Sequence, residues 1–316
     1  GTSFSDHMVS IDWDEARGWH DATVGPLQPI PLHPAASVLH YAQEIFEGLK
    51  AYRQPDGGIA LFRPEANAAR FNASPPRLAL PELPEALFLE AVEQLVRTDR
   101  EWLPAVEGGS LYLRPFMIAT ETFLGVRPAK QYKFLVIASP AGNYFKSGAP
   151  AVSIWVSQYT RAAPGGTGEA KCGGNYAASL VPQAEAMARG PDQVVFLDAA
   201  EHKWIEELGG MNVYFVFDDG SLVTPPLGGT ILPGITRDSL FALARDEGLT
   251  VREERYSIDQ WRADAASGKL VEAFACGTAA VVTPIGKVCG HDGDFTVGSG
   301  GPGQLTGKLK ARLTAI

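Results

Sequence analysis

Residues 139–150 constrain the fold of this chain more than any other segment. They combine prolines and glycines (SPAGNYFKSGAP) and lie between two strand-like runs, residues 133–138 and residues 152–157. Proline and glycine interrupt regular secondary structure, so such a segment between two strands marks a boundary. The chain has 316 residues, which is long for one hydrophobic core and suits two domains. We therefore predict a small N-terminal α/β domain over residues 1–140, a linker over residues 141–150 and a large C-terminal domain over residues 151–316.

Helical and strand-like patterns occur on both sides of this boundary. Apolar residues recur at helical spacing after Pro84, at Phe88, Val92, Leu95 and Val96, and helix-like segments cover residues 175–189 and 236–247. Strand-like runs lie at residues 111–115, 133–138, 193–197, 213–217 and 271–275. This interleaving predicts a mixed α and β architecture.

The charge and the length of the apolar runs argue against two classes of protein. The formal net charge is −9, and no block of lysines or arginines could follow the phosphates of a nucleic acid. The longest apolar runs have the length of strands, far below the roughly 20 residues that cross a bilayer. We expect neither a nucleic-acid partner nor a membrane segment.

The cysteines and the N-terminus favour a reducing compartment. Cys172, Cys276 and Cys289 form no CxxC pair and leave an odd count. The first residues show no basic region that leads into an apolar one, so no secretory signal is visible. We expect a cytoplasmic protein. The histidines show no ligand spacing, and we predict no metal site.

Lys171 is followed by residues 172–174 (CGG), which place its amine beside backbone with almost no side-chain bulk. A lysine that forms an imine with an aldehyde cofactor needs this clearance, together with surroundings that lower its pKa. Glu207 adds a carboxylate ahead of a second glycine pair, and glycine-rich turns follow at residues 228–229 and 277–278. An amine, a carboxylate and turns of phosphate size together indicate pyridoxal 5'-phosphate as the cofactor.

Five motifs extend this pattern over most of the chain. They are YAQEIFEGLK at residues 41–50, KCGGNY at 171–176, ELGGMN at 207–212, TPPLGG at 224–229 and ILPG at 231–234. In this order they resemble the branched-chain amino acid aminotransferases of the fold type IV pyridoxal-phosphate family, and the resemblance runs from about Phe4 to the last residues. It implies a two-domain, mixed α and β fold like that of D-amino acid aminotransferase, with the cofactor bound by the C-terminal domain.

The resemblance also implies an activity and a partner. The reaction would transfer the amino group between leucine, isoleucine or valine and 2-oxoglutarate, giving branched 2-keto acids and L-glutamate in branched-chain amino acid biosynthesis. The family builds each active site at the interface of a homodimer. The nearest rivals, a D-amino acid aminotransferase and an aminodeoxychorismate lyase, should lack residues 46–50 (FEGLK) and 112–115 (YLRP). A catalytically silent binding protein on the same fold is the alternative from another class.

The resemblance assigns the cofactor contacts one by one. Lys171 would anchor the cofactor and, once released, act as the base that moves the proton from the substrate Cα. Glu207 would keep the ring nitrogen protonated, because neighbouring Glu206 would point to the opposite face of a strand. Tyr176 would bind the phenolate oxygen. The implied phosphate contacts are Arg70, Ile235 and Thr236 at the start of a helix-like segment, and Thr278.

The substrate pocket must accept an aliphatic side chain and then the carboxylate of glutamate. Arg114 would receive that carboxylate through its bidentate geometry, while Tyr112 and the backbone at Thr278 and Ala279 would hold the α-carboxylate. The partner subunit would contribute three members of the pocket. The implied substrate contacts are Phe46, Tyr41, Tyr112, Arg114, Leu124, Val126, Thr278 and Ala279, of which Tyr41, Leu124 and Val126 would come from the partner.

Two smaller expectations concern a loop and the thiols. Residues 161–169 (RAAPGGTGE) are too rich in glycine for regular structure and precede Lys171, so we predict a mobile loop over the site. Animal members of the family carry a CxxC pair where this chain has Ala280 and Thr283, so we expect no thiol switch. The cysteines nearest to the motifs should act as small packing residues.

Overall fold

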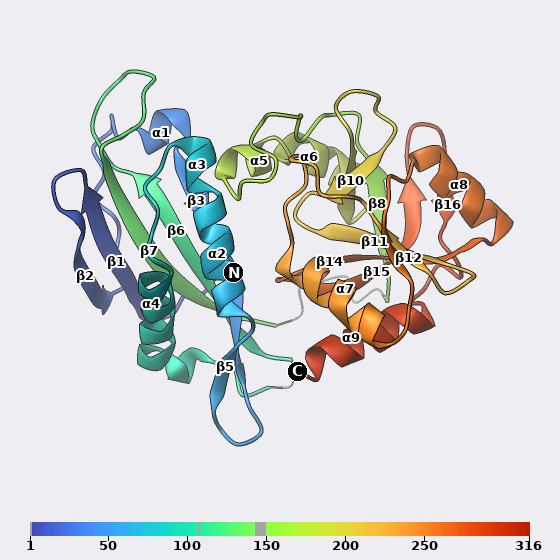
Figure 1. The fold of residues 1–316 in the computed structure, drawn as a ribbon, viewed down its shortest axis with the longest axis horizontal. Helices are drawn as coiled ribbons and strands as arrows, with labels where there is room; N and C mark the ends of the chain where they lie inside the picture. Colours follow the sequence, from blue (N-terminus) through green and yellow to red (C-terminus); the bar gives the residue numbers. More distant parts are fainter. Residues whose placement is uncertain (1, 107, 143–149) are drawn as a thin grey trace. The chain divides into compact units, whose positions relative to one another are not determined.

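The computed structural model describes residues 2–106, 108–142 and 150–316 (Figure 1). The chain forms two compact units, Gly1–Tyr144 with Ala170–Gly174, and Phe145–Glu169 with Asn175–Ile316. Most of the predicted linker, residues 143–149, lies outside the described residues, so the linker stays a prediction. The segment that carries Lys171 groups with the first unit, whereas the sequence analysis placed it in the C-terminal domain.

Within the described residues, seven antiparallel strands form the sheet of the first unit. Their order is β2-β1-β7-β6-β4-β5, and β3 also pairs with β6. The predicted strands over residues 111–115 and 133–138 fall within β6 and β7 and are confirmed. The bounds are β1 His7–Asp14, β2 Gly18–Pro26, β3 Glu44–Phe46, β4 Leu49–Arg53, β5 Ile59–Leu61, β6 Ser110–Ala119 and β7 Gln131–Ala141.

The predicted helix after Pro84 is α4 (Glu85–Thr98), which packs against β1 and β7 (Figure 1). Its predicted apolar stripe is buried, and the ring of Phe88 lies 5.4 Å from that of Phe71 and 6.1 Å from that of Phe134. Phe71 belongs to α2, so the core joins both helices to the sheet. The other helices of this unit are α1 (Val38–Tyr41), α2 (Pro64–Ala73), α3 (Pro75–Leu78) and the short 3-10 helix η1 (Arg100–Trp102).

The second unit has a mixed sheet in the order β10-β9-β8-β15-β14-β11-β12-β13, with β16 paired to β15. The β8–β9, β8–β15 and β12–β13 pairs are parallel, and the other pairs are antiparallel. The bounds are β8 Val152–Val156, β9 Gln193–Leu197, β10 Ile205–Leu208, β11 Asn212–Phe217, β12 Leu222–Thr224, β13 Val251–Glu253, β14 Leu270–Gly277, β15 Val281–Cys289 and β16 Phe295–Thr296. The strands predicted over residues 193–197, 213–217 and 271–275 are confirmed.

The predicted helix over residues 175–189 is interrupted. It is divided into α5 (Gly173–Ala177) and α6 (Leu180–Arg189), because Pro182 has no N–H and a continuous helix would lose a hydrogen bond there. Pro182 instead occupies the first turn of α6, where a proline is tolerated. The helix predicted over residues 236–247 is α7 (Ile235–Asp246). The remaining helices are α8 (Ile258–Ser267) and α9 (Gln304–Thr314).

Helix α7 packs against α9, and both contact β14 (Figure 1). Strand β11 is buried along its whole length, which explains why its sequence reads as a continuous apolar run. Among the described residues, no helix combines the length and the apolar character needed to cross a membrane.

Candidate active site

Lys171 is held in the first unit by its own backbone. Its N–H donates to Ser74 Oγ at 2.9 Å, and its carbonyl accepts the N–H of Phe46 at 2.9 Å. The amine nitrogen lies 4.8 Å from the centre of the Phe46 ring. The N–H of Gly173 donates to the Glu44 carboxylate, which a Cβ on Gly173 would overlap. The missing side chain of this glycine therefore makes room for Glu44, a use that the sequence analysis did not foresee.

The amine of Lys171 has an unusual pKa. Burial lowers this pKa to about 8, the charge of Arg70 acts in the same direction, and Glu47 opposes them. At pH 7 roughly a tenth of the amine is then uncharged, compared with well under a thousandth for an ordinary lysine. A nucleophilic lysine needs such a fraction. Burial also lowers the pKa of Lys50 in β4 to about 8, so this property alone does not identify the reactive amine.

Arg70, the predicted phosphate ligand, lies on α2 against the buried carboxylate of Glu47. Its Nε and Nη2 donate to the two carboxylate oxygens at 2.7 and 2.9 Å. Asn67 and the N–H of Gly48 also donate to Glu47, at 2.7 and 3.1 Å. Burial raises the pKa of Glu47, but Arg70, Lys171 and Asn67 outweigh it, so the pKa is lowered. Glu47 lies within a motif of the sequence but had no predicted role.

Tyr112 and Arg114 lie on the same face of β6, two residues apart, as predicted for the substrate pocket. Arg114 Nη2 donates to the Tyr112 hydroxyl at 2.8 Å, and the guanidinium lies 4.6 Å from the centre of the Phe46 ring. Arg114 Nε is buried and has no hydrogen-bond acceptor among the described residues. A buried donor of this kind is rare and suits an anionic ligand. The structure thus brings Phe46, Tyr112, Arg114 and Lys171 together.

Gly48 shows why the motif needs a glycine at this position. A Cβ on Gly48 would overlap the hydroxyl of Tyr112, which lies on the neighbouring strand. The position of the Tyr112 ring, and through it the hydrogen bond to Arg114, therefore depends on the absence of a side chain at residue 48.

Tyr41, Leu124 and Val126 lie on the surface of the first unit. Their exposed fractions are 39%, 73% and 91%, and the bridge between Ala36 and Thr122 joins their two segments. The predicted origin of these residues in a partner subunit is untested by this single chain.

Glu207 lies in β10 of the second unit and is engaged by donors on both oxygens. Arg161 Nη1 is 2.7 Å from Oε1, and the N–H of Leu232 reaches the same oxygen at 3.3 Å. Asn212 Nδ2 approaches Oε2 at 3.5 Å. Arg161 was not predicted as a partner of Glu207, although it is the first residue of the glycine-rich segment over residues 161–169.

Glu206 and Glu207 point to different partners, as expected for adjacent residues of a strand. Glu206 accepts a hydrogen bond from Thr230 Oγ1 at 2.6 Å. Burial raises the pKa of Glu206, which makes its carboxyl group a weaker acid than an exposed glutamate. The assignment of the cofactor ring to Glu207 rather than to Glu206 stays a prediction.

Tyr176 and the turn that contains Thr278 approach the glycine pair after Glu207. A Cβ on Gly210 would lie 4.0 Å from the Tyr176 ring, and one on Gly277 would lie 3.5 Å from the Gly210 carbonyl oxygen. Thr278 and Ala279 form the turn between β14 and β15. The second unit therefore gathers predicted cofactor contacts from α5, β10 and the β14–β15 turn.

Helix α7 begins at Ile235 and Thr236, the predicted phosphate contacts, and Gly234 caps it without a side-chain hydrogen bond. The first N–H groups of a helix have no intrahelical acceptor and attract anions. Gly234 packs against Asn212, whose Oδ1 a Cβ would overlap. Because Asn212 also reaches Glu207, it couples the start of the helix to this carboxylate.

The glycine-rich segment over residues 161–169 has no helix or strand, as predicted. Both of its ends are anchored, by the ion pair of Arg161 and by two 2.7 Å hydrogen bonds between Thr167 and Asn175. Its predicted mobility is untested. The cysteines are buried and unpaired, and burial raises the pKa of Cys276 to about 12, so its thiol is unreactive.

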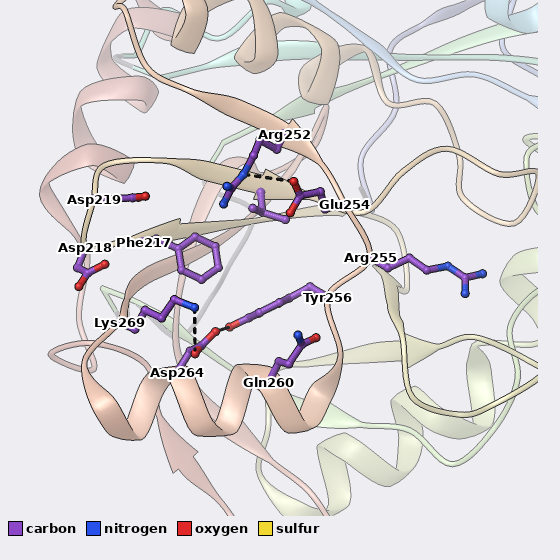
Figure 2. Close-up of a pocket in the computed structure, with 11 residues that line it drawn as sticks. Phe217, Asp218, Asp219, Arg252, Glu254, Arg255, Tyr256, Gln260, Asp264 and Lys269 are labelled. Atoms are coloured by element: carbon purple, nitrogen blue, oxygen red, sulfur yellow. Dashed lines mark hydrogen bonds and ion pairs between the residues drawn. The ribbon is translucent and has the colours of Figure 1, made fainter.

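A hollow of about 160 Å³ lies elsewhere in the second unit (Figure 2). Two ion pairs lie among its charged side chains, because Lys269 is 3.7 Å from Asp264 and Arg252 is 3.5 Å from Glu254. None of the predicted site residues lines this hollow. Its chemistry does not match that of the candidate site.

The residues present fit pyridoxal phosphate. An amine with a lowered pKa suits an aldehyde, and the orphaned donor of Arg114 suits a substrate carboxylate. The start of α7 suits a phosphate, because no side chain of this helix's N-cap occupies its N–H groups.

Comparisons with known proteins agree with this chemistry. The family described as amino-transferase class IV matches residues 44–288. The chain is 58% identical to the branched-chain-amino-acid aminotransferase of Mycolicibacterium smegmatis, over 100% of this chain and 87% of that protein. The crystal structure of Escherichia coli branched-chain amino acid aminotransferase superposes with a TM-score of 0.83 at 27% identity, covering 99% of this chain and 94% of that one. The T.th. branched-chain amino acid aminotransferase with pyridoxamine 5'-phosphate has a TM-score of 0.77 at 29% identity, covering 97% and 93%.

Proposed function

The chain belongs to the amino-transferase class IV family, and from this premise we propose that it is a branched-chain amino acid aminotransferase. It transfers the amino group between leucine, isoleucine or valine and 2-oxoglutarate, with pyridoxal 5'-phosphate as the cofactor. The products are the branched 2-keto acids and L-glutamate. The observation that carries this proposal is geometric: the buried amine of Lys171 and the guanidinium of Arg114 lie 4.8 and 4.6 Å from the centre of the same Phe46 ring.

When bound, pyridoxal phosphate supplies an electron sink for the bond that breaks at the substrate Cα. Lys171 Nζ holds the cofactor and, when free, carries the proton that leaves this carbon. Arg70, fixed by both oxygens of Glu47, presents positive charge for the phosphate. The hydrogen bonds of the Lys171 backbone with Ser74 and Phe46 fix the point from which this side chain extends.

The second unit supplies the remaining cofactor contacts. Glu207 holds a proton on the ring nitrogen, and Tyr176 binds the phenolate oxygen. Ile235 and Thr236 offer backbone N–H groups for the phosphate, and Thr278 adds a hydroxyl. The burial of Glu207 among donors supports its role as an ionised partner.

Tyr112 and Arg114 bind different carboxylates of the substrates. Tyr112, with the backbone at Thr278 and Ala279, binds the α-carboxylate that all substrates share. Arg114 receives the second carboxylate of glutamate, while Phe46 contacts the aliphatic side chain of the alternative substrate. The buried, unsatisfied Nε of Arg114 supports this division.

An amino-acceptor panel with glutamate as donor tests the proposal. The branched 2-keto acids that correspond to leucine, isoleucine and valine should be aminated, and D-glutamate should not serve as donor. Liquid chromatography of the amino acid products, resolved by chirality, measures both results. A preference for D-amino acids, or no amino transfer to any branched acceptor, would contradict the proposal.

We also propose a homodimer in which Tyr41, Leu124 and Val126 complete the site of the partner. Their exposure on the first unit supports this role, because covering them removes apolar surface from water. Light scattering of the purified chain should give about twice the chain mass of 33.8 kDa. A monomer with full activity would contradict this arrangement. A cytoplasmic location is part of the proposal, supported by the odd number of cysteines.

A further inference from the structure

Arg161 and Glu207 form an ion pair that is buried in the second unit. Arg161 Nη1 lies 2.7 Å from Glu207 Oε1, and the two side chains are only 3% and 4% exposed. An arginine stays charged even when buried, so Arg161 places a full positive charge against the Glu207 carboxylate. Glu207 has a role in the proposed reaction, whereas no role follows from it for Arg161.

The surroundings of Glu207 favour its ionised form. The N–H of Leu232 and the amide of Asn212 point hydrogen-bond donors at the same carboxylate that Arg161 contacts. Donors and a positive charge stabilise a carboxylate and lower its tendency to take up a proton. Removing Arg161 would take away the positive charge that lies 2.7 Å from this carboxylate, so proton uptake by Glu207 would become more favourable than in the native protein.

Several contacts fix the position of the Arg161 side chain. Its Nη1 also donates to the Thr230 carbonyl at 3.4 Å, and the following Ala162 is buried. Gly168 of the same segment packs against Thr230 so closely that a Cβ would not fit. Arg161 Nε is buried without an acceptor among the described residues. A structure tolerates such an unsatisfied donor only where other contacts of the group outweigh its cost.

We propose that Arg161 is a positioning residue for transamination that acts through Glu207. Its guanidinium keeps Glu207 a carboxylate, so that the proton shared with the cofactor ring resides on the ring nitrogen. The inference rests on the proposed function, in which Glu207 is the partner of that nitrogen. The proton can reside on the ring nitrogen, which leaves Glu207 ionised, or on Glu207, which leaves both groups neutral. Because Arg161 contacts the carboxylate directly, its positive charge stabilises the first state relative to the second.

The proposal predicts that replacing Arg161 changes where the proton between Glu207 and the cofactor ring resides. In an Arg161→Met holoenzyme the proton should shift from the ring nitrogen to the Glu207 carboxyl group. Both half-reactions need the same electron sink, so both should slow by about tenfold or more and by similar factors. In an Arg161→Lys holoenzyme the positive charge is kept, and the proton should stay on the nitrogen.

Nitrogen NMR of holoenzyme labelled at the cofactor ring nitrogen measures this proton directly. The native protein and Arg161→Lys should give the signal of a protonated ring, and Arg161→Met that of an unprotonated ring. Arg252→Met is the matched control, because Arg252 also pairs with a glutamate of this unit but lines the hollow and is paired with Glu254, and its signal should equal that of the native protein. A protonated signal in Arg161→Met would overturn the inference.

A second comparison covers the case in which Arg161→Met does not fold. Glu207→Gln and the double variant Glu207→Gln with Arg161→Met both lack the buried carboxylate, and the double variant leaves no unbalanced charge. If Arg161 acts only through Glu207, the two should share the same ring signal and agree in turnover within about twofold. A further loss of tenfold or more in the double variant would contradict the inference. Failure of the native chain to bind the cofactor or to transfer amino groups would instead contradict the proposed function.

Discussion

A Lys171→Ala variant should remain folded and lose at least about 1,000-fold in transamination, together with all covalent attachment of the cofactor. The reason is that one amine both holds the cofactor and carries the Cα proton, and alanine can do neither. The backbone contacts to Ser74 and Phe46 do not involve the side chain, so the fold should survive. Circular dichroism measures the fold, and the glutamate-donor assay measures turnover.

Lys50 provides the sharpest control for this result, because burial also lowers its pKa to about 8. After borohydride reduction of the native holoenzyme, peptide mapping should find the cofactor on Lys171 and not on Lys50. A modified Lys50, or a Lys171→Ala variant with full activity, would remove Lys171 from the mechanism.

The pKa of Lys171 also predicts how the rate of cofactor attachment depends on pH. The amine must be uncharged to attack, so the rate of cofactor attachment to the apoenzyme should rise about tenfold per pH unit below pH 8. The rate should level off above about pH 8, where most of the amine is already neutral. An increase that continues to pH 10 would show that the amine keeps an ordinary pKa. Stopped-flow absorbance of the covalent product measures this rate.

An Arg114→Met variant should lose about 100-fold in kcat/KM for the glutamate half-reaction and only a fewfold for the leucine half-reaction. Methionine keeps the length of the side chain but removes the charge and the donors that would bind the second carboxylate of glutamate. The small common loss follows from two contacts. Arg114 donates to the Tyr112 hydroxyl, and its charge also helps to lower the pKa of Lys171.

Tyr112→Phe is the matched control for Arg114→Met. It removes the hydroxyl that would bind the α-carboxylate, a group that glutamate and leucine share, so both half-reactions should fall by similar factors. Single-turnover kinetics of each half-reaction measure these effects. Equal losses of the two half-reactions in Arg114→Met would show that Arg114 does not select glutamate.

Local patterns in the sequence predicted part of the secondary structure. The stripe of Phe88, Val92 and Leu95 predicted a helix because apolar spacing is a property of neighbouring residues, and α4 buries this stripe. The prediction over residues 175–189 was less accurate. It followed the apolar spacing across Pro182 and missed the interruption between α5 and α6, although the proline itself was the available signal.

The candidate site was predicted in its residue types but not in its contacts. Arg70 was assigned to a phosphate from its motif position, yet its bidentate partner Glu47 went unnoticed, since the two are 23 positions apart in the sequence. Gly48 carried no visible reason for being a glycine until Tyr112 was found where its Cβ would be.

The sequence by itself determined the predicted helix α4 and strands β6 and β7, the lysine close to two glycines, and the alternation that separates Glu206 from Glu207, because these depend on residues close together along the chain. Only the tertiary structure decided which charges meet and how deeply they are buried. The pairing of Arg161 with Glu207 and the pKa of Lys171 belong to this second group. The physical reason is that electrostatic energy depends on distance in space and on exclusion of water, and the spacing of residues in a sequence specifies neither.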